Sequence, residues 1–422
     1  MTPYPTATAH LCINSERLRD DFEQVSAIGL TPDRGVCRLA LSMEDLEARA
    51  WFANRIEEAG FFVQDDDAGN LSGVLRAPDP RARTLLVGSH LDTVPNAGRY
   101  DGTLGIVAAL ECLRTISEAG ITLPCHLEVI DFTDDEGTWM PMFGSMSLTG
   151  RLNPNFMKSA NGQAALFRAA LTQAGIHPDD VVKARRDPDT VLAYIEMHVE
   201  QGWRLERAHV DVGVVTGIVA RMSHIVTFHG QASHAGTASM RERHDALQGA
   251  ARFITRAHEL VREHFPEGAL NCGGLEVHPG TLTTVPDKAR LLVEWRHTNL
   301  ALHDEMGRAL LALVQECAAA ANVTAETRQL AHIPAAQMSH TVIDSIERAC
   351  KIVGVTHTRM ASYASHNAQV MSTFTPTGML FIPSLNGISH NPEEFSRWED
   401  VVKGTNVLLH TILDLAATAG PR

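Results

Sequence analysis

Apolar runs alternate with stretches of helical periodicity over the first half of the chain. Residues 84–88 (TLLVG) form an apolar run typical of a buried strand, 103–119 carry apolar residues at helical spacing, and 126–132 resemble the next strand. This order is a βαβ unit, whose strands run parallel and end at the same edge of a sheet. Further strands are expected at 193–199 and 212–219. The pattern predicts an α/β domain with a sheet flanked by helices.

The pattern changes near residue 221. The expected elements that follow, in order, are a strand at 222–229, a helix at 245–263, strands at 274–278 and 289–295, a helix at 302–321 and a strand at 324–330. This β-α-β-β-α-β order is typical of a small two-layer α+β domain.

The small domain is inserted into the first one, because helical periodicity and a strand resume at 342–353, 378–383 and 401–417. The predicted division is a first domain built from residues 1–215 and 333–422, with a mixed sheet. Residues 216–332 form the inserted domain.

Charge and cysteine usage exclude several classes. With 50 acidic against 36 basic residues the formal charge is −14, which disfavours nucleic acid and anionic membranes as partners. The seven cysteines are scattered singly, so disulfides and thiolate metal sites are not expected. No apolar run reaches membrane-spanning length and the start has no basic segment before an apolar one. We therefore expect a soluble cytoplasmic protein. Its 21 histidines are the unusual feature of its composition.

The first residues that could bind a metal ion or take part in catalysis lie directly after the first strand of the βαβ unit. His90 and Asp92 flank one residue there, and Asp101 follows in a glycine-flanked turn before the helix. Ligands of open α/β sheets bind where strands end, and an imidazole with two carboxylates suits a divalent cation. The alternative is an ordinary polar loop in which Asp101 caps the helix.

An acidic cluster follows the next strand. Asp134, Asp135 and Glu136 are adjacent, and such carboxylates repel one another unless a positive charge lies among them or water screens them. Taken alone, a solvated acidic turn is the simpler interpretation. Because the two loops follow successive strands, together they favour a metal site.

Three histidines recur in glycine-containing segments: His198 in EMHVEQG, His234 in QASHAGT and His390 in GISHNPEE. Each one alone is better explained as an ordinary loop histidine. Together they supply the nitrogen ligands that a two-metal site needs.

These segments carry a family resemblance. From about Cys12 to the C-terminal helix, the chain has GSHLDTV, YDGTLG, DEG, HVEQG, SHAGT, PTGMLF and GISHNPEE in one order. It thereby resembles the dinuclear-metal aminoacylase and carboxypeptidase-like amidohydrolases. HVEQG and GISHNPEE are most similar to the hydantoinase/carbamoylase amidases, which include N-carbamoyl-L-amino-acid hydrolases, β-ureidopropionases and allantoate amidohydrolases.

The resemblance implies an exopeptidase-like catalytic domain that holds two divalent metal ions per subunit, with Zn²⁺ first and Mn²⁺, Co²⁺ or Ni²⁺ as alternatives. His90, Asp101 and His198 match the ligands of one ion. Asp101, Glu136 and His390 match those of the other, so Asp101 bridges the pair.

The resemblance also implies roles around the metals. Asp135 matches the general base that acts on a metal-activated bridging water, and Asp92 the carboxylate that orients His90. His234 matches a lid histidine that reaches the reacting carbonyl oxygen across a dimer, so the inserted domain is expected to be a lid and a homodimer interface. The residues expected to contact a small carboxylate-bearing substrate are Gln201, Thr283, Arg296, Tyr363 and Ser389, with Arg296 clamping the carboxylate.

The implied function is a metal-dependent amidohydrolase that cleaves a linear amide or ureido C–N bond. One alternative is an aminoacylase or dipeptidase-type hydrolase. Another is a metal-binding relative with weak or no activity, because Asp135 stands where the family usually has a glutamate. Aspartate is shorter by one methylene, or about 1.5 Å, and misplacement on that scale can cost roughly 100-fold in rate.

Two further departures concern the substrate. Thr283 replaces an asparagine that the subgroup uses to hold the substrate, and Tyr363 replaces a glycine near the metals. We therefore expect the substrate to be an acid-bearing amide or ureido compound other than the common N-carbamoyl-L-amino acids.

Overall fold

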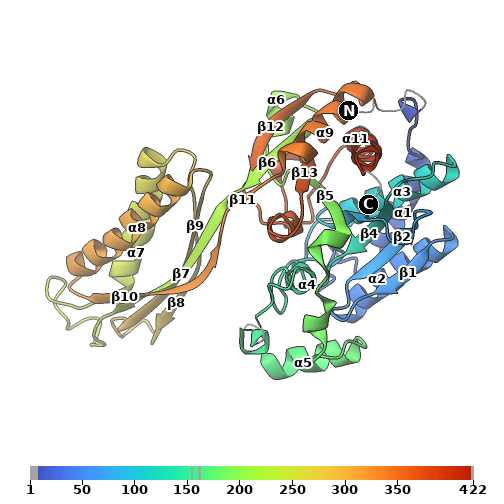
Figure 1. Cartoon of the computed structure of the whole chain (residues 1–422). Coiled ribbons are helices and arrows are strands. Elements are labelled where there is room, and N and C mark those ends of the chain that lie inside the picture. The colour runs from blue at the N-terminus through green and yellow to red at the C-terminus, as the bar shows by residue number, and fades with distance from the viewer. Residues whose placement is uncertain (1–7, 154, 160–162, 420–422) are drawn as a thin grey trace. The chain divides into compact units, whose positions relative to one another are not determined.

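The computed structural model describes residues 8–153, 155–159 and 163–419, and the chain divides into two compact units (Figure 1). Unit 1 comprises Met1–Gly217 and Gln337–Arg422, and unit 2 comprises Ile218–Ala336. The chain therefore leaves unit 1 once and returns to it once.

Unit 1 is built on a nine-stranded mixed sheet within the described residues, in the order β1-β2-β4-β3-β5-β13-β6-β11, with β12 paired to β6. The strands are β1 (Phe62–Asp65), β2 (Leu71–Leu75), β3 (Thr84–Ser89), β4 (His126–Asp131), β5 (Val191–Val199), β6 (Val212–Ile218), β11 (Ala336–Gln337), β12 (His357–Ser362) and β13 (Thr377–Ile382).

Helices surround this sheet. The α-helices of unit 1 are α1 (Ser15–Ser26), α2 (Met43–Glu58), α3 (Thr103–Glu118), α4 (Phe143–Leu148), α5 (Ala164–Gln173), α6 (Arg204–Ala208), α9 (His340–Val353), α10 (Asn367–Met371) and α11 (Trp398–Ala417). Short 3-10 helices lie at η2 (Phe156–Ser159), η3 (Val181–Ala184), η4 (Pro188–Thr190) and η5 (Leu385–Gly387).

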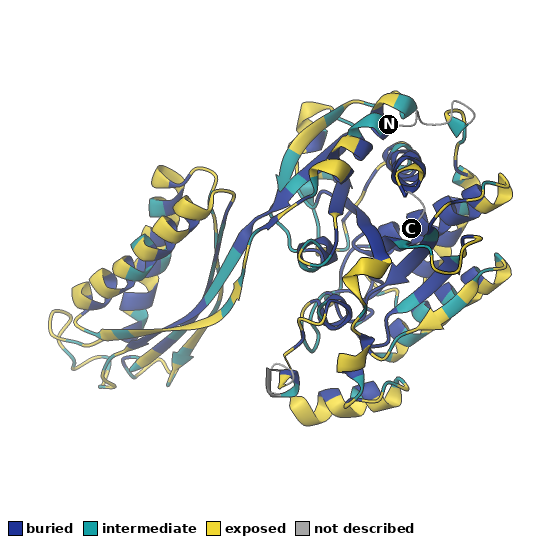
Figure 2. Ribbon diagram, in the orientation of Figure 1, coloured by how far each residue is buried: buried dark blue, intermediate teal, exposed yellow. Residues whose placement is uncertain are grey.

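The centre of the sheet is parallel and buried. β4, β3, β5 and β13 run parallel to one another, and β5 and β13 are buried at every position (Figure 2). A parallel sheet covered on both faces needs mostly apolar strands, as these are, and the buried polar residues among them include Glu128 on β4 and Glu196 on β5. Gly88 on β3 lies so close to β4 that a Cβ would come within 1.9 Å of the Ile130 carbonyl oxygen. The parallel strands therefore bring the segments that follow them to one edge.

Helix α3 packs on β3, β4 and β5 and also contacts α1 and α11, so it is buried from Thr103 to Ile116. Its sequence is apolar nearly all round, as burial on every side requires. The two charged residues in its buried part are paired, since Glu111 binds Arg17 at 2.7 Å and Arg114 binds Asp21.

Unit 2 is a two-layer α+β domain. Its elements are β7 (Ala220–His229), α7 (Ala246–His264), β8 (Ala269–His278), β9 (Lys288–His297), α8 (Leu300–Ala320) and β10 (Thr324–Ile333). The strands form an antiparallel sheet in the order β10-β7-β9-β8, and α7 and α8 pack against it over a core that includes Phe228, Phe253 and Trp295 (Figure 1).

The fold class predicted from the sequence is therefore confirmed, with a mixed α/β sheet interrupted by a β-α-β-β-α-β segment. Every helix in the described part of the chain is too short or too polar to cross a lipid bilayer.

Candidate metal centre

The chemistry-bearing residues follow the parallel strands. His90 comes directly after β3, the acidic run 134–136 follows β4, and His198 lies near the end of β5. The fourth segment, which carries His390, follows β13. Because these strands end at the same sheet edge, side chains far apart in sequence lie close together.

Two donor groups share one carboxylate. Asp101 Oδ1 lies 3.0 Å from His198 Nε2 and 3.6 Å from His90 Nε2, and its Oδ2 lies 3.2 Å from His390 Nε2. Glu136 Oε1 completes the second group, 3.7 Å from His390 Nε2. In each group the three ligand atoms lie within 4.8 Å of one another.

These spacings fit metal coordination. Ligand atoms placed tetrahedrally about 2.1 Å from a Zn²⁺ ion are separated by about 3.4 Å. The two oxygens of Asp101 face different groups, which is the arrangement of a carboxylate that bridges two ions. The residues present therefore fit two divalent cations.

The orientation of two imidazole rings is set by backbone carbonyls. The Nδ1 of His90 lies 2.9 Å from the Asp92 carbonyl oxygen, and that of His198 lies 2.9 Å from the Val199 carbonyl oxygen. When Nδ1–H donates to a carbonyl, Nε2 carries the free lone pair that a metal needs. Both rings then present Nε2 to Asp101.

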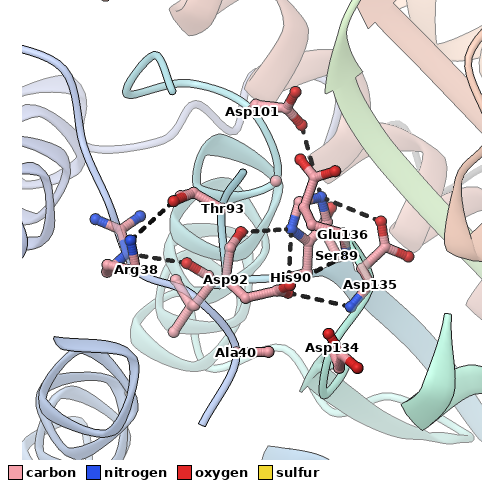
Figure 3. A network of polar contacts seen from close by, with 12 residues as sticks. Arg38, Ala40, Ser89, His90, Asp92, Thr93, Asp101, Asp134, Asp135 and Glu136 are labelled. Carbon is pink, nitrogen blue, oxygen red and sulfur yellow. Dashed lines mark hydrogen bonds and ion pairs between the residues drawn. The ribbon is translucent and has the colours of Figure 1, made fainter. Parts of the chain in front are cut away.

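Asp92 connects the two loops. Its carboxylate accepts the backbone N–H groups of Asp135 and Glu136, at 3.2 and 3.1 Å, and lies 3.5 Å from His90 Nδ1 (Figure 3). The carboxylate was predicted to orient His90, but in the structure the closest partner of the ring is the carbonyl of the same residue. The side chain of Asp92 chiefly holds the segment that carries Asp135 and Glu136.

The electrostatics of the cluster favour a cation. Burial raises the pKa of Asp135 to about 7 and that of Glu136 well above its usual range. Burial also opposes ionisation of Asp101, but the charge of His198 and hydrogen bonds from the histidines outweigh it and hold its pKa well below the usual range. Neighbouring carboxylates in turn raise the pKa of His90 and His198 against the effect of burial. Divalent ions in the two donor groups would supply positive charge among these buried carboxylates.

Two buried acceptors at the centre have no hydrogen-bond partner among the described residues, Asp135 Oδ1 and Gln201 Oε1. The other oxygen of Asp135 lies 3.5 Å from His90 Nε2, so the shorter aspartate side chain does reach the donor groups. An orphaned acceptor in such a place is satisfied by a water or an ion.

Both alternative interpretations of the loops are wrong. The N-cap of α3 is Gly102, with no side-chain cap, so Asp101 does not serve as a helix cap. The acidic run is not a solvated turn, because Asp134 and Asp135 are buried. Asp134 turns away from the donor groups and accepts the backbone N–H groups of Trp139 and Met140 at 3.2 and 2.7 Å.

Gly102 is required at its position for two reasons. Its φ is +63°, in the region that favours glycine, and a Cβ would lie 2.3 Å from the His90 ring. The start of α3 can therefore approach the imidazole closely enough to present Asp101.

Sequence reasoning missed Arg38. This arginine is fully buried, and burial lowers its pKa to about 10. Its Nε donates to the Leu91 carbonyl at 2.9 Å, and its Nη2 donates to Thr103 Oγ1 at 2.5 Å. Its backbone also exchanges hydrogen bonds with Thr93 (Figure 3). Arg38 thus ties the His90 loop to the start of α3; an isolated arginine in CRLA carries no spacing signal that could have revealed this.

Three of the predicted substrate contacts lie in unit 1. The Gln201 amide donates to Asp101 Oδ2 at 2.6 Å, and the Ser389 hydroxyl lies 3.3 Å from the same oxygen. Tyr363 is half-buried, and the Arg204 guanidinium lies 4.8 Å above its ring. Gln201 and Ser389 thus border the donor groups directly.

The other three predicted residues belong to unit 2. His234 is exposed, and its backbone forms an isolated bridge with Thr284. Thr283 is exposed, and its carbonyl accepts the Ala235 N–H at 2.8 Å. Arg296 on β9 lies 2.6 Å from the Glu294 carboxylate, so its guanidinium already pairs with an acid of its own strand.

Comparison with known proteins gives consistent matches over most of the chain. The family model described as peptidase family M20/M25/M40 matches residues 86–414. An N-carbamoyl-L-amino acid amidohydrolase of Geobacillus stearothermophilus is 36% identical, over 96% of this chain and 99% of the relative. A ureidoglycolate hydrolase of Arabidopsis thaliana is 30% identical, over 96% of this chain and 87% of the relative.

Solved structures agree. A hydantoinase/carbamoylase family amidase from Burkholderia vietnamiensis has a TM-score of 0.88 and 30% identity, covering 98% of this chain and 100% of that one. The crystal structure of AtUAH in complex with (S)-hydroxyglycine also has a TM-score of 0.88 and 30% identity, covering 97% of this chain and 99% of that one.

The shared carboxylate leads to a prediction about metal stoichiometry. After removal of bound metal with a chelator, wild type should bind two equivalents of Co²⁺ or Zn²⁺ in isothermal titration. His198→Ala and His390→Ala should each lose one equivalent, and Asp101→Ala should lose both, because both groups use its oxygens. His177→Ala, whose side chain is 70% exposed, is the control. Two equivalents retained by Asp101→Ala would contradict the assignment.

Proposed function

The chain belongs to peptidase family M20/M25/M40, in its hydantoinase/carbamoylase amidase group, and on this premise we propose that it hydrolyses a linear amide or ureido C–N bond in a small carboxylate-bearing molecule. It is a metal-dependent amidohydrolase of the kind that includes carbamoylases, allantoate amidohydrolases and ureidoglycolate hydrolases. The observation that carries the proposal is the pair of donor groups that share Asp101, with the unpartnered Asp135 oxygen beside them.

The assigned ligands are His90, Asp101 and His198 for one ion and Asp101, Glu136 and His390 for the other. Zn²⁺ is the first choice, and Mn²⁺, Co²⁺ and Ni²⁺ also suit nitrogen and oxygen donors. When bound, the two ions lower the pKa of the attacking water and polarise the carbonyl oxygen of the substrate.

Asp135 is the proposed general base and acid. Its free Oδ1 accepts a proton from the attacking water, and the same carboxyl group then donates that proton to the leaving nitrogen. Asp92 supports this step, because its carboxylate holds the backbone N–H of Asp135. The other carboxylate oxygen, Oδ2, lies 3.5 Å from His90 Nε2 and so faces the first donor group.

Further residues are proposed to contact the substrate. In unit 1, Gln201 and Ser389 border the donor groups, and Tyr363 is proposed as a further substrate contact. In unit 2, Arg296 is proposed to bind the substrate carboxylate, since a guanidinium matches a carboxylate in fork geometry. His234 is proposed to donate to the developing oxyanion, and Thr283 to contact the substrate.

The main alternative is a metal-binding relative without hydrolase activity, and it rests on aspartate at position 135. The distance of 3.5 Å between Asp135 Oδ2 and His90 Nε2 favours a working base instead, because the shorter side chain still reaches the donor groups. An aminoacylase or dipeptidase activity is the other alternative, and a substrate panel separates it from amide and ureido hydrolysis.

A panel of N-carbamoyl-L-amino acids, ureidoglycolate, allantoate, N-acyl amino acids and dipeptides should show turnover confined to ureido or amide acids. Release of ammonia or of a free amine measures it. Because Thr283 and Tyr363 depart from the subgroup, the common N-carbamoyl-L-amino acids should be poor substrates. Efficient turnover of these compounds would refute that specificity, and activity on dipeptides alone would refute the amidase proposal.

Substitution of the proposed base is the second functional test. Asp135→Asn should lower kcat on the best substrate by about 10²- to 10⁴-fold, the usual contribution of a general base, with metal content unchanged. Asp135→Glu should remain active, since it lengthens the side chain and keeps the carboxylate. Asp79→Asn, at a side chain 53% exposed, is the control. If Asp135→Asn keeps kcat within about tenfold of wild type, Asp135 is not the base.

We also propose that the protein is a homodimer that associates through unit 2. Strand β8 lies at an end of its sheet, and an edge strand offers unpaired backbone groups to a second copy. Leu275 on β8 is 43% exposed and adds apolar area to that edge.

Light scattering after size exclusion should give twice the chain mass of 46.0 kDa for wild type. Leu275→Lys should shift the protein toward monomer, since an edge lysine opposes strand pairing. Leu330→Lys on β10, at the opposite edge of the sheet, is the matched control and should leave the dimer intact. A monomeric wild type would disprove the proposal.

A further inference from the structure

A buried glutamate joins the two segments that carry Asp101 and His390. Glu394 Oε1 accepts the backbone N–H of Tyr100 at 2.8 Å and that of Asp101 at 3.0 Å. Its Oε2 accepts the Ser389 hydroxyl at 2.6 Å, from the residue directly before His390. Glu394 is only 3% exposed, so these bonds are protected from competition with water.

The two segments are packed in one arrangement. A Cβ on Gly98 would lie 2.2 Å from the Glu394 Cβ, so only glycine allows the loop before Asp101 to approach this closely. The N–H of Glu394 in turn donates to the Asn391 carbonyl at 2.9 Å, which closes the turn next to His390. The carboxylate therefore sits at a fixed position between the two loops.

His390 needs such support more than the other histidines do. The rings of His90 and His198 are oriented by Nδ1 contacts to backbone carbonyls. For His390, the contacts found among the described residues all involve Nε2, and its side chain is 50% exposed. The position of the His390 ring is therefore set mainly by the backbone of the loop that carries it.

We propose that Glu394 is a positioning residue for the second metal group, holding the Asp101 backbone and the His390 loop at the spacing that lets both bind one ion. The inference rests on the two-metal site of the proposed function. Glu394 does not itself contact the proposed ligand atoms of Asp101 and His390. It acts through the two backbone N–H groups and through Ser389.

The test is a Co²⁺ titration of chelated protein, followed by calorimetry and by the visible absorption of the bound ion. Wild type should fill two sites. Glu394→Ala should weaken the site of Asp101, Glu136 and His390 by about 10- to 100-fold, the usual cost of losing a residue that orients metal ligands. The site that contains His90 and His198 shares Asp101 and should weaken too, but by less, because carbonyl contacts that Glu394 does not make orient both of its histidine rings.

Further variants at position 394 distinguish a positioning role of the carboxylate from a general loss of structure. Glu394→Gln keeps the length and one carbonyl oxygen, which can accept both N–H groups, so it should recover most of the affinity. Glu394→Asp is too short to reach both loops and should behave like alanine. A cavity of about 440 Å³, lined in part by Leu30, Arg34 and Phe395, borders Glu394. Acetate should therefore enter the space left in Glu394→Ala and restore binding, whereas wild type in the same acetate should be unchanged.

The inference is overturned if Glu394→Ala binds the second ion as wild type does, or if it weakens both sites equally. It is also overturned if neither glutamine nor acetate restores what alanine loses. These outcomes differ from failure of the proposed function, in which wild type itself would fill fewer than two sites or hydrolyse nothing on the panel.

Discussion

Asp101 presents one carboxylate oxygen to each of two donor groups. The surrounding residues must hold this carboxylate at one position and stabilise its buried charge. A buried carboxylate is costly unless cations or hydrogen bonds surround it. Here the imidazoles of His198 and His390 approach its two oxygens to 3.0 and 3.2 Å, and the carboxyl groups of Glu136 and Asp135 lie nearby. The carboxyl groups of the cluster therefore need positive charge close to them. Divalent ions bound by these residues would provide it.

Two buried side chains, Arg38 and Glu394, hold the segments around Asp101 in place. On one side Arg38 joins the Leu91 carbonyl to the Thr103 hydroxyl, so the segment with His90 and the start of α3 cannot move apart. On the other side Glu394 holds the Asp101 N–H. Both side chains are buried. Glu394 accepts hydrogen bonds from Tyr100, Asp101 and Ser389, and Arg38 divides its bonds between the Leu91–Thr103 segment and the carbonyls of Val25 and Ile28. An arginine and a glutamate that never touch the proposed ions thereby control where the ligands stand.

Much of the fold and of the candidate site was predictable from the chain. Apolar runs and helical periodicity located the central strands β3 to β6 and β13 and most of the long helices, because burial on a central sheet demands apolar residues at those positions. Other elements, including β1, β2, α1 and α2, were not predicted. Boundaries were less accurate: β8 begins at Ala269 rather than at residue 274, and α8 begins at Leu300 because Asn299 accepts the first N–H groups of the helix. The proposed ligands were named from motifs and from resemblance. Arg38 and Glu394 were not, because each acts on residues distant in sequence.

The sequence by itself determined the central βαβ unit, the inserted β-α-β-β-α-β segment, the family and the chemical types of the candidate ligands, since these depend on local periodicity and on motifs. Only the tertiary structure decided which neighbouring carboxylates face the site. Asp134 and Asp135 are adjacent, yet the first binds the N–H groups of Trp139 and Met140, and the second turns toward His90. Side-chain direction in a turn depends on which backbone groups are left without partners, and that is settled only when the strands have packed and their loops have met.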